Sequence, residues 1–394
     1  MKPPARDTFI FLLCSRAFRS IALIYMTLAF SLYLSALGVG VVEIGIIAGA
    51  SVLFMALMTL FLGMIGDRHG YKSELIISEA VTLAGAMIVA SSANITFIEI
   101  GMILAGLSSG AGGLRGAFSP GVNAFVAGSY PDHSDRVKKF SLLTSIASIS
   151  AIFGSVMLGS VSMLTKYIGL ASAYRAVFLL SSFMLIISLA SLLMLKEHKR
   201  PQKTTRMMKP SSFAYVSKII VSNSIGGVGM GIAVPLLPLW FVMMYHANTL
   251  QISIIFSISY IITALGAYVS SRIYARINAL NTASATRAFN GLLLIAMAFS
   301  PLLALSGLLY VLRSFSVGMG SPSRSAVNVR GVHEEDYGTA TSLQGVSTRI
   351  SQLSSGASGY LMDYSVPLPL FVGGIFQFAS GIAYKLLLGQ EKDR

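Results

Sequence analysis

The sequence contains about twelve long apolar stretches, and this feature limits the possible folds more than any other. Each stretch has roughly 20 mostly apolar residues, the length that a helix needs to cross the ~30 Å hydrocarbon core of a bilayer. Across the 394 residues, 54% are hydrophobic and only 11% are charged, whereas soluble domains have about 25% charged residues. A water-soluble protein of this size could not bury so much apolar surface. The composition therefore predicts a membrane protein and argues against soluble enzymes and nucleic-acid-binding proteins.

The apolar stretches predict an all-α polytopic protein with twelve transmembrane helices. Backbone groups in lipid must be bonded within helices or a closed barrel, and barrel strands would alternate apolar and polar residues, which these stretches do not. The predicted spans lie near residues 17–37, 43–64, 74–93, 97–127, 140–162, 174–195, 213–245, 250–272, 285–303, 305–328, 338–362 and 367–388.

The basic residues predict the orientation in the membrane, because Lys and Arg accumulate in cytoplasmic loops. If both termini are cytoplasmic, the inner segments hold most of the 29 Lys and Arg residues. The outer loops then contain only Lys166 and Arg175. We expect a multi-pass protein of the cell (plasma) membrane whose basic inner loops contact membrane lipids.

The chain divides into two halves of six predicted spans each. A basic, proline-containing cytoplasmic linker at residues 196–212 separates residues 1–195 from residues 213–394. Shifting the sequence by 202 residues aligns several identical residues, among them Pro120 with Pro322. A repeat of this kind is typical of transporters built from two related halves. We therefore predict two pseudo-symmetric six-helix bundles.

The segment between the second and third predicted spans carries a recognisable motif. It reads Gly63-Met-Ile-Gly-Asp67-Arg68-His-Gly70-Tyr-Lys72. This segment resembles the signature loop of the major facilitator superfamily, G-x-x-x-D-R-x-G-R-K, with Tyr71 in place of the first basic residue. Together with the span number, the repeat and the linker, the resemblance covers the whole chain. It implies a secondary transporter that works by alternating access, with the first, fourth, seventh and tenth helices around a central cavity.

Each residue of the motif has a role that suits a gate. Gly63 would let two helices approach closely, and Asp67 could accept hydrogen bonds from N–H groups at a helix N-terminus. Arg68 and Lys72 could pair with acidic groups or lipid phosphates. Gly70 would permit the tight turn between the helices.

Ionisable residues within the spans are candidates for substrate binding, because their burial in a membrane is costly. Arg115, Arg313 and Arg349 lie in the fourth, tenth and eleventh spans, and a guanidinium matches a carboxylate or phosphate in two hydrogen bonds. Asn223 in the seventh span and Tyr33 in the first are further candidates. The alternatives are bonds that hold helices together for the arginines, glycine packing around Asn223, and a lipid-facing position for Tyr33.

Other charged residues have more ordinary expected roles. Glu43, Glu79 and Asp363 are candidates for proton coupling, although none lies clearly at mid-membrane. Arg16 and Arg19 share one helix face near the predicted inner end of the first span, where they would anchor the helix at the lipid interface. We expect no catalytic residues, no cofactor and no metal site, because the sequence has no P-loop and its five histidines are scattered.

The cationic spans favour a transporter for a small anionic or zwitterionic organic solute, coupled to a proton or a counter-anion. We expect the transporter to be a monomer. One alternative is efflux of amphipathic, drug-like compounds by proton antiport. The segment Gly154-Ser-Val-Met-Leu-Gly159 lacks the proline and one glycine of the G-P-x-x-G-G pattern that such antiporters carry, which weakens this alternative. A non-transporting membrane receptor or scaffold is the third hypothesis.

Overall fold

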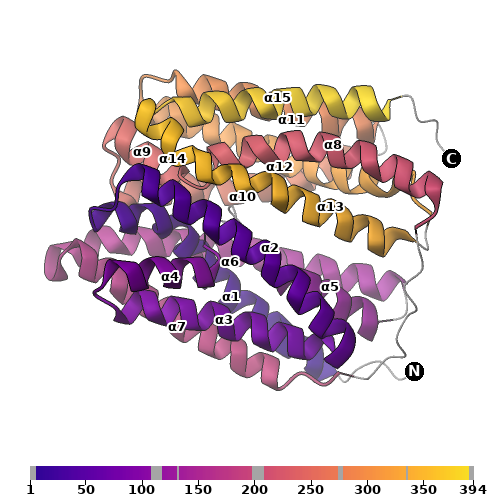
Figure 1. The fold of residues 1–394 in the computed structure, drawn as a ribbon, viewed down its shortest axis with the longest axis horizontal. Coiled ribbons are helices and arrows are strands. Elements are labelled where there is room, and N and C mark those ends of the chain that lie inside the picture. The colour runs from indigo at the N-terminus through magenta and orange to yellow at the C-terminus, as the bar shows by residue number, and fades with distance from the viewer. Residues whose placement is uncertain are drawn as a thin grey trace. The chain divides into compact units, whose positions relative to one another are not determined.

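In the computed structural model, every regular element of the described residues is a helix (Figure 1). The described residues are 6–107, 118–130, 133–197, 208–273, 278–333 and 336–389. The first half of the chain forms helices α1 (Arg6–Ala36), α2 (Val41–His69), α3 (Tyr71–Ser91), α4 (Ile95–Ala105), α5 (Phe118–Ser129), α6 (His133–Ile168) and α7 (Leu170–Leu193). The second half forms α8 (Pro210–Ala233), α9 (Leu237–Tyr245), α10 (Thr249–Ile273), α11 (Ala279–Ala298), α12 (Leu303–Arg330), α13 (Tyr337–Ser351), the 3-10 helix η2 (Gln352–Ser354), α14 (Ser355–Tyr364) and α15 (Leu368–Leu388).

Nine of the described helices are long and apolar enough to cross a membrane, so the prediction of a helical multi-pass membrane protein is confirmed. Several predicted spans correspond to more than one helix. The span at 213–245 contains α8 and α9, which are separated at residues 234–236, and the span at 338–362 contains α13, η2 and α14. Pro235 and Pro238 explain the first interruption, because proline cannot donate the helical hydrogen bond and crowds the preceding turn.

The first helix begins earlier than predicted. We expected a span at residues 17–37, whereas α1 already includes Arg6 and its apolar span runs from Thr8 to Ala36. The segment from residue 6 to residue 16 is rich in Phe, Leu and Ile and contains no glycine or proline that would end a helix. Arg16 and Arg19 therefore lie two or more turns inside the helix.

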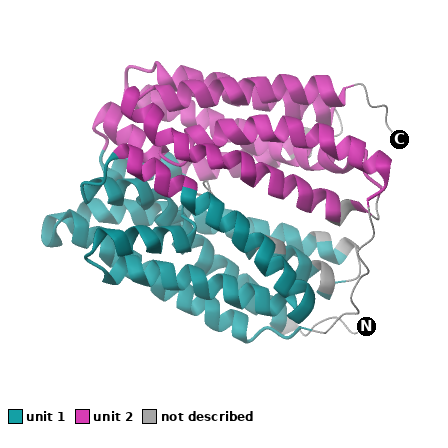
Figure 2. Cartoon of the chain, in the orientation of Figure 1, with its two compact units in different colours: residues 1–40, 50–204, 248–257 teal, residues 41–49, 205–247, 258–394 magenta. Residues whose placement is uncertain are grey.

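The chain forms two compact units, and neither is one continuous piece of chain (Figure 2). Unit 1 comprises residues 1–40, 50–204 and 248–257, and unit 2 comprises residues 41–49, 205–247 and 258–394. The start of α2 thus belongs to unit 2, and the start of α10 belongs to unit 1.

In unit 1, α1 packs against α6 and α7, and α3 packs against α4, α5 and α7. The start of α10 joins α6 through hydroxyl groups: Ser253 donates to the Ser155 carbonyl over 2.8 Å, and the Ser155 and Ser257 hydroxyls lie 2.7 Å apart. Small polar residues of this kind bond helices across an apolar environment.

In unit 2, α8 packs against α13 and α15, and α11 packs against α12 and α15. Glycines set the spacing of these helices. A Cβ atom on Gly229 of α8 would lie 2.6 Å from the Gly373 carbonyl oxygen of α15. A Cβ on Gly45, at the start of α2, would lie 2.6 Å from the backbone nitrogen of Gly359 in α14. Such close backbone contacts exclude any larger residue.

Candidate functional site

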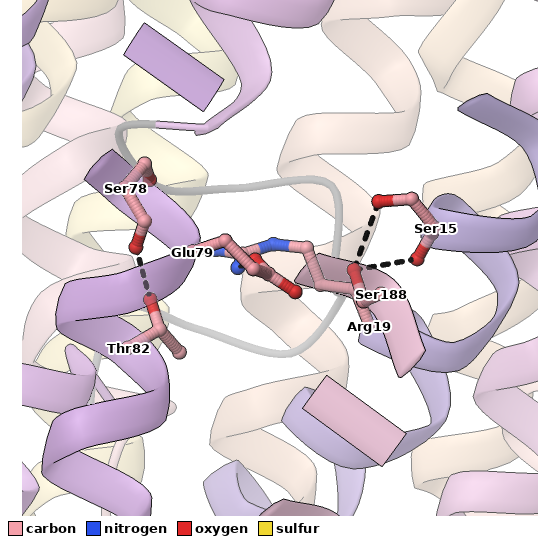
Figure 3. Close-up of polar contacts among 6 residues, drawn as sticks. All are labelled: Ser15, Arg19, Ser78, Glu79, Thr82 and Ser188. Carbon is pink, nitrogen blue, oxygen red and sulfur yellow. Dashed lines mark hydrogen bonds and ion pairs between the residues drawn. The ribbon is translucent and has the colours of Figure 1, made fainter. Parts of the chain in front are cut away.

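A buried ion pair joins α1 to α3 in unit 1 (Figure 3). The Nη1 group of Arg19 donates to Oε2 of Glu79, and both side chains are almost completely buried. The Arg19 guanidinium also lies over the Phe118 ring of α5, 4.3 Å from its centroid. Beside the pair, the Ser15 and Ser188 hydroxyls lie 2.8 Å apart and connect α1 to α7. We call Ser15, Arg19, Glu79 and Ser188 the unit 1 cluster.

The unit 1 cluster corrects one prediction. Arg16 and Arg19 do not anchor α1 at a lipid interface, because they are only 3% and 1% exposed. The error follows from the early start of α1, which moves both residues into the packed part of the helix. Of the three candidates for proton coupling, Glu79 is buried, whereas Glu43 and Asp363 are exposed.

A second buried arginine lies between α8, α11 and α15 in unit 2. Arg287 of α11 donates through Nη2 to the side-chain oxygen of Asn223 over 2.5 Å, and through Nη1 to the hydroxyls of Ser380 at 3.0 Å and Ser222 at 3.4 Å. Its guanidinium lies 4.5 Å from the centroid of the Tyr384 ring. We call these five residues the unit 2 cluster. All these partners are uncharged.

The sequence did not single out Arg287, because the predicted span began at residue 285 and placed it at a span end. Helix α11 begins at Ala279, so Arg287 lies about two turns inside it. Residues 278–286, which precede Arg287, are partly polar but contain no proline. A helix can therefore begin well before residue 285, and this signal could have identified Arg287 as a residue inside a span. Asn223, which we predicted to bind substrate, uses its side-chain oxygen to accept the Arg287 bond.

Arg313 of α12 is also buried, at 5% exposure. Its Nη2 group lies 3.3 Å from the sulfur of Met230, and its guanidinium lies 5.6 Å from the centroid of the Tyr310 ring. Its Nε atom has no hydrogen-bond partner among the described residues. Arg349 is half-buried in α13, and Arg115 falls in residues 108–117, outside the described residues.

Tyr33 lies inside unit 1 and does not face lipid, because it is completely buried. Its hydroxyl accepts a 2.9 Å hydrogen bond from Nε of Arg175. Its ring packs against Tyr174 and Phe178 of α7, with centroids 5.3 and 5.6 Å away. The lipid-facing alternative for Tyr33 is therefore wrong.

The motif between α2 and α3 is fixed to the end of α7. Glu197 accepts hydrogen bonds from the backbone N–H groups of Tyr71 at 2.9 Å and Lys72 at 2.7 Å. The Lys72 ammonium in turn donates to the Leu193 carbonyl over 2.7 Å. A carboxylate at this position satisfies the free donors of the first helical turn and favours the helix dipole. Glu197 thus performs at α3 the role that we expected of Asp67.

The other residues of the motif agree with the sequence predictions only in part. Asp67 accepts a 2.9 Å hydrogen bond from the Tyr71 hydroxyl. Gly70 makes the expected tight turn with φ 102°, a value that other residues rarely adopt. Gly63 does not lie in a close helix contact, because a Cβ atom there would meet nothing within 4 Å. Arg68 is exposed.

Comparison with known proteins settles the family. A model of the Major Facilitator Superfamily matches residues 8–356. The chain belongs to the major facilitator superfamily. Among curated protein sequences, none matches it. Its fold is nevertheless shared with solved transporters of this superfamily.

Three solved structures illustrate the shared fold. An auto-inhibited POT family peptide transporter is 13% identical, with a TM-score of 0.75 and 98% of each chain covered. The POT family transporter PepTSo is 14% identical, with a TM-score of 0.74 and 98% of each chain covered. A bacterial homologue of the human lysosomal transporter Spinster, solved in an inward-facing, unoccupied conformation, is 12% identical, with a TM-score of 0.68, and covers 99% of this chain and 96% of its own. These identities establish the fold alone. The family is one of membrane transporters for small molecules.

Proposed function

We propose that the protein is a secondary transporter that moves a small anionic or zwitterionic organic solute by alternating access. It would use two six-helix bundles, residues 1–195 and 213–394, joined by the cytoplasmic linker at 196–212. We further propose twelve spans, cytoplasmic termini, a plasma-membrane location in contact with lipids, and a monomeric state.

The observation that carries the substrate class is the environment of Arg313. Its guanidinium is buried beside the Met230 sulfur and the Tyr310 side chain, with which it forms a hydrogen bond, and Nε has no partner among the described residues. A guanidinium stays charged in such a place and is stabilised by an anion that forms two hydrogen bonds with it. A carboxylate or phosphate group on the solute would supply that anion.

The remaining candidates would assist Arg313. We propose that Arg115 and Arg349 contribute further positive charge and that Asn223 and Tyr33 orient the solute through their polar groups. Proton coupling would use a carboxylate. Glu79 suits this role best, since burial and pairing with Arg19 tie its charge to the packing of α1 and α3, and Glu43 and Asp363 are the exposed alternatives.

Flux measurements in liposomes test this proposal. The purified full-length protein would be reconstituted, and uptake of labelled mono- and dicarboxylates, amino acids and organic cations would be followed with and without a pH gradient. We expect saturable flux of the anionic or zwitterionic solutes, reduced at least tenfold in Arg313→Gln. Lys166→Gln, which removes one exposed positive charge, is the matched control and should retain the flux.

The same measurements distinguish the alternatives. Carboxylate flux that is unchanged in Arg313→Gln would contradict the assignment of this residue. Transport restricted to amphipathic cations and abolished without the gradient would replace the proposal with drug efflux by proton antiport. Ligand binding without flux of any solute would indicate a receptor.

A further inference from the structure

Arg16 is a buried charge of unit 1 whose side chain lacks hydrogen-bond partners among the described residues at two of its nitrogen atoms. It lies on α1, one turn before Arg19, and is 3% exposed. Its Nε and Nη1 atoms have no hydrogen-bond partner among the described residues. The charges that act on it are those of Arg19, which repels it, and Glu79, which attracts it. Glu79 already pairs with Arg19.

The surroundings of Arg16 therefore hold two guanidiniums and one carboxylate. Glu74 of α3 is also buried, but the charges that act on it are those of Asp67 and Glu197 and not that of Arg16. Helices α5 and α7 contain no Asp or Glu, and Asp135 of α6 is exposed. Asp7 is the only acidic residue of α1, and it precedes Arg16 by nine residues, or about 13 Å along a helix.

A buried positive charge that no protein group neutralises requires an anion from outside the chain. The Nε and Nη1 groups of Arg16 are N–H donors without a partner among the described residues, and each can donate to a carboxylate oxygen. One bound monoanion would make the combined charge of Arg16, Arg19, Glu79 and the ligand zero.

We propose that Arg16, supported by the charge of Arg19, is a binding site for the carboxylate group of the transported solute. Arg16 donates to the ligand, and Glu79 keeps Arg19 from binding a second anion. The solute class rests on the proposed function, but binding at Arg16 is measurable without transport.

Binding to the purified full-length protein in detergent tests the site. Sodium acetate and sodium benzoate would be titrated against sodium chloride at equal concentration, with thermal stabilisation and calorimetry as readouts. We expect carboxylate-specific binding that weakens at least tenfold in Arg16→Gln and less in Arg16→Lys, because lysine keeps the charge but loses the paired donors. Lys166→Gln should bind like the unaltered protein.

Glu79→Gln provides a second arm that leaves Arg16 intact. Loss of this carboxylate frees Arg19, so we expect carboxylate affinity to rise several-fold. The proposal is overturned if the unaltered protein shows no preference for carboxylate over chloride, if Arg16→Gln binds normally, or if Glu79→Gln leaves the affinity unchanged. Solute flux with no Arg16-dependent binding would refute this site and leave the transport function standing. Arg16-dependent binding without flux of any solute would support this site and refute the transport function.

Discussion

The two units each bury an arginine at a junction of three helices, and they stabilise it in different ways. In unit 1, Arg19 bonds to the carboxylate of Glu79 between α1 and α3. In unit 2, the bonds of Arg287 to described residues all go to neutral oxygens of α8 and α15, and its guanidinium stacks on an aromatic ring. An ion pair joins two helices through one strong contact. The neutral arrangement spreads one charge over several weaker contacts, each of which is easier to replace.

The units are more alike in how a distant carboxylate holds the start of a helix. Glu197 accepts from two backbone N–H groups at the start of α3. Asp336 accepts from the Lys209 N–H, just before α8, over 3.2 Å. In both units the acidic residue lies in a connection and not in a span. The units thus resemble each other in this contact and differ in how they stabilise a buried arginine.

The largest expected effect comes from removing the unit 1 carboxylate. Glu79→Ala leaves Arg19 charged and buried without its partner, which should lower the free energy of unfolding by about 3–5 kcal/mol. Denaturant titration in mixed micelles would measure the loss. The double variant Arg19→Leu with Glu79→Ala should regain most of it, and Glu43→Ala, which removes an exposed carboxylate, should have little effect. A stable single variant would show that the ion pair is not required.

A smaller effect is expected in unit 2. Arg287→Leu removes the charge and leaves only neutral acceptors without a donor, which should cost about 1–3 kcal/mol. The same titration applies, with Lys218→Leu on α8 as a comparison at a half-buried position. If Arg287→Leu lowers the free energy of unfolding as much as Glu79→Ala does, then a charged partner and neutral partners do not stabilise the two arginines differently.

The smallest effect concerns Asp336 and depends on pH. Hydrogen bonds from the Ser212 hydroxyl and the Lys209 N–H hold the pKa of Asp336 below its ordinary value of 3.8. A lowered pKa in the folded state stabilises the protein above the ordinary value, and this contribution disappears as the pH falls through the folded-state pKa. Asp336→Asn should therefore lower the melting temperature at pH 7 and have a smaller effect near pH 3. Asp363→Asn is the exposed control; an equal loss at both pH values would contradict the assignment.

Much of the fold could be predicted from local sequence. The apolar stretches predicted the membrane helices because their length alone decides whether they cross a bilayer. Gly70 predicted its turn because a positive φ favours glycine. The family resemblance, read from the loop around Asp67, was also confirmed.

The polar clusters could not be predicted in the same way. Arg19 and Glu79 are 60 residues apart, and Arg287 and Asn223 are 64 residues apart. No sequence spacing brings them together; the packing of α1 and α3 on α7, and of α8 and α11 on α15, does. Helix starts were a second source of error. The sequence predicts span ends near Arg16, Arg19 and Arg287, whereas α1 begins at Arg6 and α11 begins at Ala279.

The exchange of helix starts between the units has a consequence for fragments of the protein. Unit 2 contains the start of α2, where Gly45 fits against Gly359, and unit 1 contains the start of α10, where Ser253 bonds to Ser155. A polypeptide cut in the linker would give two pieces, each of which lacks part of its own compact unit and carries part of the other. Neither piece is a complete compact unit. We therefore expect each fragment to need the other for its final packing.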